Sequence, residues 1–309
     1  MSVFELSIKL VVLIGLGYGA RKLKIIADGF DKMLTRFVMA IPLPCMIVNS
    51  FQIDFSMQDL MNCPILLGMA VLGAALNLGL SQWVYRRMGG TGLARSVRFA
   101  LTFTNFTFFG LPVVSELYGA QGVFYYVIFT LPMRILFYGM APMLLGNQQK
   151  MSVKEMAKKF FTEPVVAVFI GFFIYLVQLP LPRVAVNIIQ TLGAMASPLG
   201  LILCGVIIAD ARWRDIVKYP CVLWVSGLRL LLIPALALGI YMLLGIDMDM
   251  IRPVIFYFAM PVASLLPTFS LRYHPEDVEA RVAGGYLVVG STLLCIATVP
   301  LWAMILGRL

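Results

Sequence analysis

Apolar residues occur along this chain in long runs that short polar clusters separate. Ten of these runs are long enough for a helix that crosses a bilayer, which takes about 20 residues. They cover residues 4–20, 33–51, 63–84, 97–118, 122–146, 163–179, 185–208, 219–244, 252–271 and 282–306. The pattern therefore predicts an all-α polytopic membrane protein with ten transmembrane helices.

The composition agrees with this prediction and excludes several other classes. Of the 309 residues, 61% are hydrophobic and 13% are charged, whereas soluble domains are about one quarter charged. The five cysteines are scattered without paired spacing and the chain has a single histidine, so we expect no metal site and no cofactor. Nucleophile and phosphate-loop motifs are absent from the sequence, which argues against an enzyme.

Lysine and arginine gather in alternate loops. Eighteen of the 24 lie in or beside the loops that follow the first, third, fifth, seventh and ninth runs. Cytoplasmic loops of membrane proteins collect these residues, so both termini are predicted to lie outside. The net charge of +9 is thus explained by topology, and no nucleic-acid partner is expected.

The chain divides into two halves of five runs each. Residues 1–149 form the first half, residues 150–162 a basic cytoplasmic linker, and residues 163–309 the second half. Because five is odd, the second half must cross the membrane in the opposite sense to the first. Two inverted five-helix repeats are predicted.

Proline positions support the repeat. Pro44 and Pro198 are 154 residues apart, and Pro112 and Pro267 are 155 apart. Inverted repeats whose corresponding helices are interrupted are a sequence sign of secondary transporters, with the substrate site near the bilayer midplane. The alternative is that these prolines are ordinary kinks of membrane helices.

The fourth run contains the stretch TNFTFFGLPVVSELYG, in which polar and helix-breaking residues occur together. Pro112 cannot donate a backbone hydrogen bond, so it is predicted to break this helix beside Gly110 and to free the carbonyl of Phe108. Asn105 and Thr107 are polar neighbours of this break.

The ninth run contains FAMPVASLLPTFS, where Pro261 and Pro267 bracket Ser264. If both broken helices face one another, each presents a helix N-terminus equivalent to roughly half a positive charge. An anion would fit between them.

Cationic residues also lie inside the apolar runs, whereas no carboxylate falls at mid-membrane. Arg134 could bind a carboxylate or could satisfy freed backbone carbonyls. A structural pairing is favoured for Arg229, and Lys9 is close enough to the outer end of its run to extend to the membrane surface. The lack of central acidic pairs disfavours a cation exchanger.

Four stretches together resemble the auxin efflux carrier family of bacterial and plant transporters. They are GLGYGARKLKII, AIPLPCMIVNSF, TNFTFFGLPVVSELYG and FYFAMPVASLLPTFSLRY. The resemblance implies two inverted five-helix repeats, a scaffold domain, a transport domain and often a homodimer. It also implies that the broken fourth and ninth helices cross, as in sodium/proton antiporters and bile-acid symporters.

The substrates implied by the family are organic anions, namely auxin in plants and malate, malonate and similar carboxylates in bacteria. The family pattern places Asn105 beside the substrate carboxylate, and makes Pro112 and either Pro261 or Pro267 the crossing prolines. The short central loop favours a bacterial source, and therefore a location in the cell (inner) membrane.

The sequence thus predicts a secondary carrier that exports a small carboxylate by alternating access, with an elevator-type movement. Alternatives are a sodium- or proton-coupled symporter of the bile-acid type, and an anion channel or receptor on the same scaffold. The candidate substrate-binding residues are Asn105, Thr107, Gly110, Pro112, Arg134, Pro261, Ser264 and Pro267, with Pro44, Pro198, Arg229 and Lys9 as secondary candidates.

Overall fold

A computed structural model describes residues 3–145, 160–209, 219–273 and 277–309 of the chain. Every regular element in these ranges is a helix. In chain order the α-helices are α1 (Val3–Lys22), α2 (Phe30–Ala40), α3 (Pro42–Ser50), α4 (Met57–Arg87), α5 (Gly92–Thr102), α6 (Leu111–Leu144), α8 (Glu163–Val177), α9 (Arg183–Ala194), α10 (Ala196–Ala209), α12 (Cys221–Gly227), α13 (Ile233–Leu243), α14 (Met248–Phe258), α15 (Leu266–Tyr273) and α16 (Val278–Arg308). Two π-helical turns, η1 (Phe106–Gly110) and η2 (Leu228–Leu232), precede α6 and α13.

Long apolar helices make this a multi-pass membrane protein. Within the described ranges, six helical stretches are long and apolar enough to cross a bilayer. They are Phe30–Ser50, Met57–Arg87, Phe106–Ala141, Arg183–Ala209, Cys221–Leu243 and Val282–Arg308. Many large apolar side chains are exposed on the surface, for example those of Phe4, Val71 and Leu243. Such a surface is suited to contact with lipid. The prediction of an all-α polytopic membrane protein is confirmed.

Several of the predicted spans are interrupted. The run 33–51 is divided into α2 and α3 at Ile41, whose backbone leaves the helical region, and the run 185–208 is divided into α9 and α10 at Met195. The run 252–271 is divided between α14 and α15. Each interruption leaves backbone groups that need partners from elsewhere in the fold.

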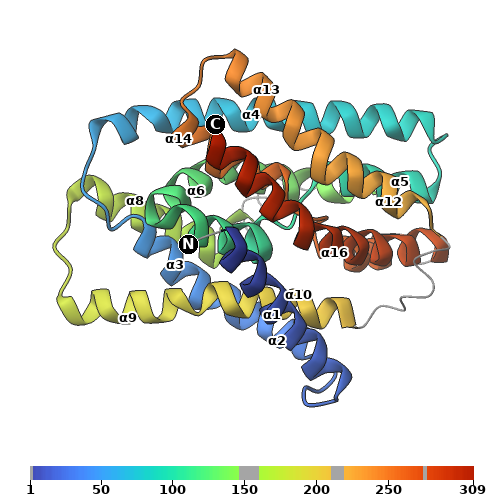
Figure 1. Cartoon of the computed structure of the whole chain (residues 1–309), viewed down its shortest axis with the longest axis horizontal. Helices are drawn as coiled ribbons and strands as arrows, with labels where there is room; N and C mark the ends of the chain where they lie inside the picture. Colours follow the sequence, from blue (N-terminus) through green and yellow to red (C-terminus); the bar gives the residue numbers. More distant parts are fainter. Residues whose placement is uncertain (1–2, 146–159, 210–218, 274–276) are drawn as a thin grey trace.

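The helices pack in two groups. The first group is α1, α2, α3, α8, α9 and α10, and the second is α4, α5, α6, α12, α13, α14, α15 and α16; each packs mainly within itself. Figure 1 shows α4 across the upper part of the molecule and α9 and α10 end to end across the lower part. The first group meets the second chiefly where α10 contacts η1 and α6, where α3 contacts α6 and where α1 contacts α16.

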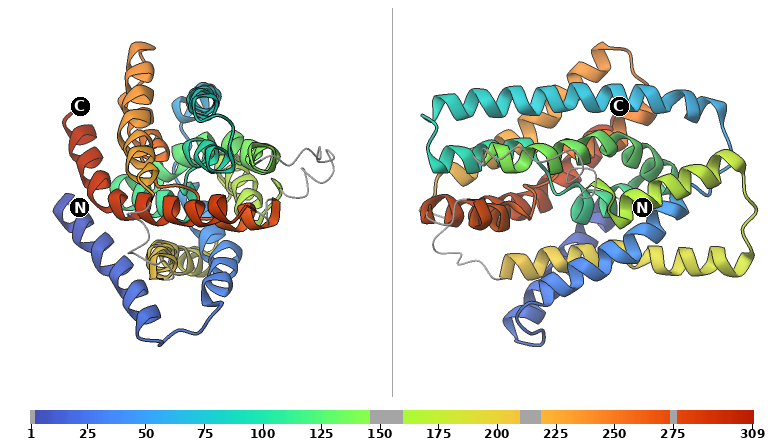
Figure 2. Two further views of the ribbon diagram at one scale, coloured as in Figure 1. Left: turned by 90° about the vertical axis from the view of Figure 1, so that its right-hand side faces the viewer. Right: turned by 180° about the vertical axis from the view of Figure 1, so that it is seen from behind.

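Glycines allow α1 and α10 to approach closely within the first group. A Cβ atom at Gly17 would collide with the backbone carbonyl of Ile202, and one at Gly205 would collide with the carbonyl of Ile14. The two ends of the described chain lie on one face of the molecule (Figure 2). Of the predicted linker 150–162, residues 150–159 lie outside the described residues.

Candidate functional site

The interruptions in the fourth and ninth runs meet inside the molecule. Thr104 and Val262 form an isolated antiparallel bridge. The backbone N–H of Asn105 donates to the carbonyl of Pro261 at 2.8 Å, and that of Ala263 donates to the carbonyl of Phe103 at 3.2 Å. Each broken helix thus satisfies polar backbone groups of the other, which is what makes non-helical backbone tolerable at this depth. We call this place the crossover.

The break in the fourth run lies before the position predicted from proline. The chain is non-helical from Phe103 to Asn105, whereas Pro112 lies within the helical stretch that begins at Phe106, just after the π-helical turn η1. The side-chain oxygen of Asn105 accepts a hydrogen bond from the N–H of Phe108 at 3.2 Å. Asn105 is therefore an N-cap that starts the next helical stretch, so the assignment of the break to Gly110 and Pro112 was wrong.

The two prolines of the ninth run have different places. Pro261 is buried within the crossover and its carbonyl is paired with Asn105. Pro267 is the second residue of α15, a position that a proline can occupy without breaking the helix. Of the two candidates, Pro261 is the one at the crossing.

Arg229 binds the ends of the two helices that lead into the crossover. Its side chain is fully buried. Its Nη1 donates to the carbonyl of Leu101, in the last turn of α5, at 2.8 Å, and its Nε to the carbonyl of Met260, just after α14, at 3.5 Å. Helix C-termini carry partial negative charge, so a guanidinium stabilises both. The structural pairing predicted for Arg229 is present.

A cavity of about 120 Å³ lies at the crossover, and we call it the crossover cavity. It is lined by Thr35, Met39, Thr104, Asn105, Phe106, Thr107, Phe108, Arg134, Phe137, Tyr138, Ala263, Ser264 and Leu265. Four of the predicted site residues are thus brought together: Asn105, Thr107, Arg134 and Ser264. The helical stretch that begins at Phe106 and the helix α15 both start at this cavity.

Arg134 supplies the charge in the crossover cavity. Its side chain is 2% exposed, and its guanidinium carbon lies 4.9 Å from the ring centroid of Phe106. Within the part of the chain that the structure describes, the Nε and Nη2 atoms have no hydrogen-bond partner, and no acidic side chain forms an ion pair with Arg134. A cation this deep without a counter-charge is costly.

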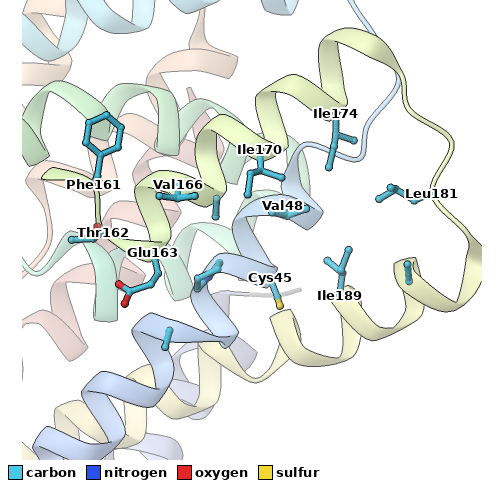
Figure 3. A pocket seen from close by; sticks show the side chains of 14 residues that line it. Cys45, Val48, Phe161, Thr162, Glu163, Val166, Ile170, Ile174, Leu181 and Ile189 are labelled. Carbon is cyan, nitrogen blue, oxygen red and sulfur yellow. The ribbon is translucent and has the colours of Figure 1, made fainter. Parts of the chain in front are cut away.

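A second cavity has a different character. It measures about 780 Å³ and lies between α3, α8 and α9. Figure 3 shows Val166, Ile170 and Ile174 of α8 opposite Val48 and Ile189. Pro44 lines this cavity. The charged residue in the lining of the cavity is Glu163, which would repel an anion. Pro44 does not line the crossover cavity.

Two further candidates line a third cavity, of about 610 Å³, which we call the outer cavity. Lys9 and Pro198 belong to it. The Nζ of Lys9 lies 2.6 Å from the Oε1 of Glu116, so Lys9 forms an ion pair within the protein. Neither residue lines the crossover cavity.

Comparison with known proteins shows the family of the chain. The model of a family described as membrane transport protein matches residues 2–303. The chain belongs to the membrane transport protein family. It is the family that the sequence motifs resembled. The chain is also 25% identical, over 304 residues and 98% of each chain, to a protein of Methanothermobacter thermautotrophicus named as an uncharacterised transporter.

In this transporter, Gly110 supports the crossover by close packing rather than by lining the cavity. A Cβ atom at Gly110 would collide with the hydroxyl of Tyr126 and lie 3.2 Å from the side chain of Met260. The Tyr126 hydroxyl donates to the carbonyl of Phe106 at 3.1 Å. Gly110 therefore matters for packing. A Cβ atom added at Gly200 of α10 would lie 3.4 Å from the ring of Pro112.

Sequence reasoning missed several residues of the transporter's cavity. Phe137 and Tyr138 follow Arg134 by three and four residues, so they lie on the same helix face, and this spacing could have identified them. Thr35 and Met39 come from α2, and no local pattern connects them with the crossover.

Proposed function

We propose that the protein carries a small organic anion across the membrane by alternating access, with the crossover cavity as its binding site. The observation that carries the proposal is Arg134, a buried guanidinium that lines a cavity and has no acidic partner in the described ranges. A bound carboxylate would supply the missing counter-charge and could accept from Nε and Nη2 together, as the guanidinium fork allows.

The helix ends around the crossover favour the same ligand. The first N–H groups of a helix lack acceptors within the helix and carry partial positive charge. Phe106 and Thr107 begin one helical stretch, and Ser264 and Leu265 immediately precede another. The C-terminal ends of α5 and α14 would repel an anion, and their carbonyl groups bind Arg229 instead. We expect the carboxylate to contact Arg134, the amide of Asn105 and these helix starts.

The size and walls of the cavity limit the substrate. A volume of about 120 Å³ admits only a small molecule, and Phe106, Phe108 and Phe137 provide apolar walls. Arg134 is the cationic residue among the lining residues. We expect a substrate with one carboxylate at the arginine and a short apolar or weakly polar remainder.

We infer that the fold is built from two inverted five-helix repeats, residues 1–149 and 163–309, with 150–162 as the linker. The interruptions at Ile41 and Met195 support this, because they are 154 residues apart. The mutual pairing of the breaks in the fourth and ninth runs gives further support. In this description Gly119, which has φ of 59° within α6, separates the fourth span from the fifth.

We infer that both termini face outward from the cell membrane. The turn at 88–91, which arginines flank, lies at the opposite end of the molecule from the loops 51–56 and 178–182 (Figure 1). Basic residues favour the cytoplasmic side for the turn. Two groups of helices joined by limited contacts suit a scaffold and a moving transport domain, and a homodimer through the scaffold is expected from the family resemblance.

Export is the direction that needs no coupling ion. With the cell interior negative, a monovalent anion gains roughly 2.3 kcal/mol per 100 mV on leaving. A sodium- or proton-coupled symporter would instead show binding that depends on that cation. A channel or receptor would show no saturable counterflow of labelled against unlabelled anion.

The first experiment measures anion binding to purified protein. A thermal-shift screen of small carboxylic acids selects the ligand, and calorimetry then gives its affinity. Arg134→Gln keeps a polar side chain and removes the charge, so we expect affinity to fall by roughly tenfold to a hundredfold, since charged hydrogen bonds contribute about 1.5–3 kcal/mol.

The matched control is Arg252→Gln, because Arg252 is partly exposed on α14 and pairs with Asp249. It should leave the affinity unchanged. Equal affinity in the wild type and Arg134→Gln, with both folded, would remove Arg134 from the site.

A further inference from the structure

The outer cavity is a second polar space in the fold. Its polar lining residues are Lys9, Asn49, Ser115, Glu116, Gln190 and Ser197. It shares no lining residue with the crossover cavity. Its walls come from both packing groups, since α1, α3, α9 and α10 belong to the first group and α6 to the second.

An ion pair crosses this cavity from one packing group to the other. Lys9 of α1 lies 2.6 Å from Glu116 of α6, and the hydroxyl of Ser197 on α10 donates to the same Glu116 oxygen at 3.1 Å. The side chains of Lys9 and Glu116 are 38% and 21% exposed. The carboxylate of one group is thus held by a cation and a hydroxyl of the other.

A close contact between helices separates the two cavities. A Cβ atom at Gly200 of α10 would lie 2.6 Å from the carbonyl oxygen of Phe108 and 3.4 Å from the ring of Pro112. Phe108 lines the crossover cavity, and Pro198, two residues before Gly200, lines the outer cavity. This contact therefore lies between residues that line, or closely follow, the two cavities.

We propose that the ion pair of Lys9 with Glu116, supported by Ser197, is an outer gate that holds the two helix groups together while the crossover cavity faces the other side. The proposal rests on the alternating-access function above. Partly exposed ion pairs contribute little net free energy, so such a gate can open and re-form in each cycle. A buried network of the same groups would be too costly to break each time.

The test measures access to each cavity with single cysteine reporters in purified protein. The outer reporter is Asn49→Cys, at a half-buried position of the outer cavity, and the crossover reporter is Thr35→Cys, at a half-buried position of the crossover cavity. Both are placed in a Cys45→Ser background, because the other four cysteines are buried. The rate of reaction with a hydrophilic maleimide is then compared with and without Lys9→Met. No substrate is needed, so the result is independent of which anion is carried.

Opening of the gate should change the two labelling rates in opposite directions. Lys9→Met should raise labelling of the outer reporter by roughly up to fivefold, the factor equivalent to an exposed ion pair, and lower labelling of the crossover reporter. Glu116→Gln should act in the same way, and the charge-reversed pair Lys9→Glu with Glu116→Lys should restore both rates. Asp249→Asn is the matched control, because it breaks the exposed pair with Arg252 within α14, and should change neither rate.

Two results would overturn the gate. If both rates rise in the folded variants, the ion pair merely stabilises the packing. If neither rate changes in Lys9→Met or in Glu116→Gln, the pair does not control access. Loss of anion binding in the experiment on Arg134 would not affect either outcome, so failure of the gate and failure of the binding site are distinguishable.

Discussion

Arg134 and Arg229 show how far residue-level reasoning reaches in this protein. Both are charged residues inside apolar runs, so the sequence identifies both as exceptional. What separates them is their partners: Arg229 binds the carbonyls of Leu101 and Met260, whereas Arg134 lines the crossover cavity. Those carbonyls come from helices far apart in the sequence, so no local pattern could decide between the two roles.

Substitution of Asn105 tests the proposed anion-binding site at the scale of a single residue. Asn105→Ala removes the cap on the Phe108 N–H and the side-chain amide from the cavity wall. We expect anion binding to be abolished, with a stability loss of only about 1 kcal/mol from the lost cap, because the backbone bond to Pro261 remains. Calorimetry and thermal unfolding measure the two effects. Asn187→Ala on exposed α9 is the control, and undiminished affinity in Asn105→Ala would contradict the assignment.

At the scale of elements, the sequence shows which helices are interrupted but not at which residues the interruptions occur. Prolines and glycines correctly mark the fourth and ninth runs. Pro112, however, lies inside a continuous helical stretch and Pro267 in the first turn of α15, and the breaks lie upstream of both. The chain stops being helical where Thr104 and Val262 can pair. That pairing joins residues remote in sequence, so it depends on the tertiary fold rather than on local propensity.

The contact of α10 with η1 is tested by Gly200→Ala. Its Cβ would be 2.6 Å from the Phe108 carbonyl, a backbone atom that cannot yield without moving η1. We expect a loss of about 1–3 kcal/mol, typical of overpacking, and weaker anion binding because Phe108 lines the cavity. Gly68→Ala in α4, where nothing lies within 4 Å, should be neutral or slightly stabilising. The same unfolding temperature in both variants would refute the close contact.

For the whole molecule, hydropathy was sufficient to predict a multi-pass helical membrane protein, and motifs were sufficient to predict the family. Both are confirmed. The orientation, the inverted repeats and the substrate stay predictions. The packing in two groups, with the outer cavity between them and the crossover cavity apart from it, could not be read from the sequence, because it arises from contacts between α10 and the second group.

Counterflow in proteoliposomes tests the central claim most directly. Vesicles loaded with an unlabelled carboxylate from the binding screen are diluted into a trace of the labelled compound. We expect saturable, transient accumulation of label in the wild type and in Arg252→Gln, and none in Arg134→Gln. Uptake that is linear in concentration, indifferent to the internal anion, or equal in Arg134→Gln would contradict a carrier that binds its anion at the crossover.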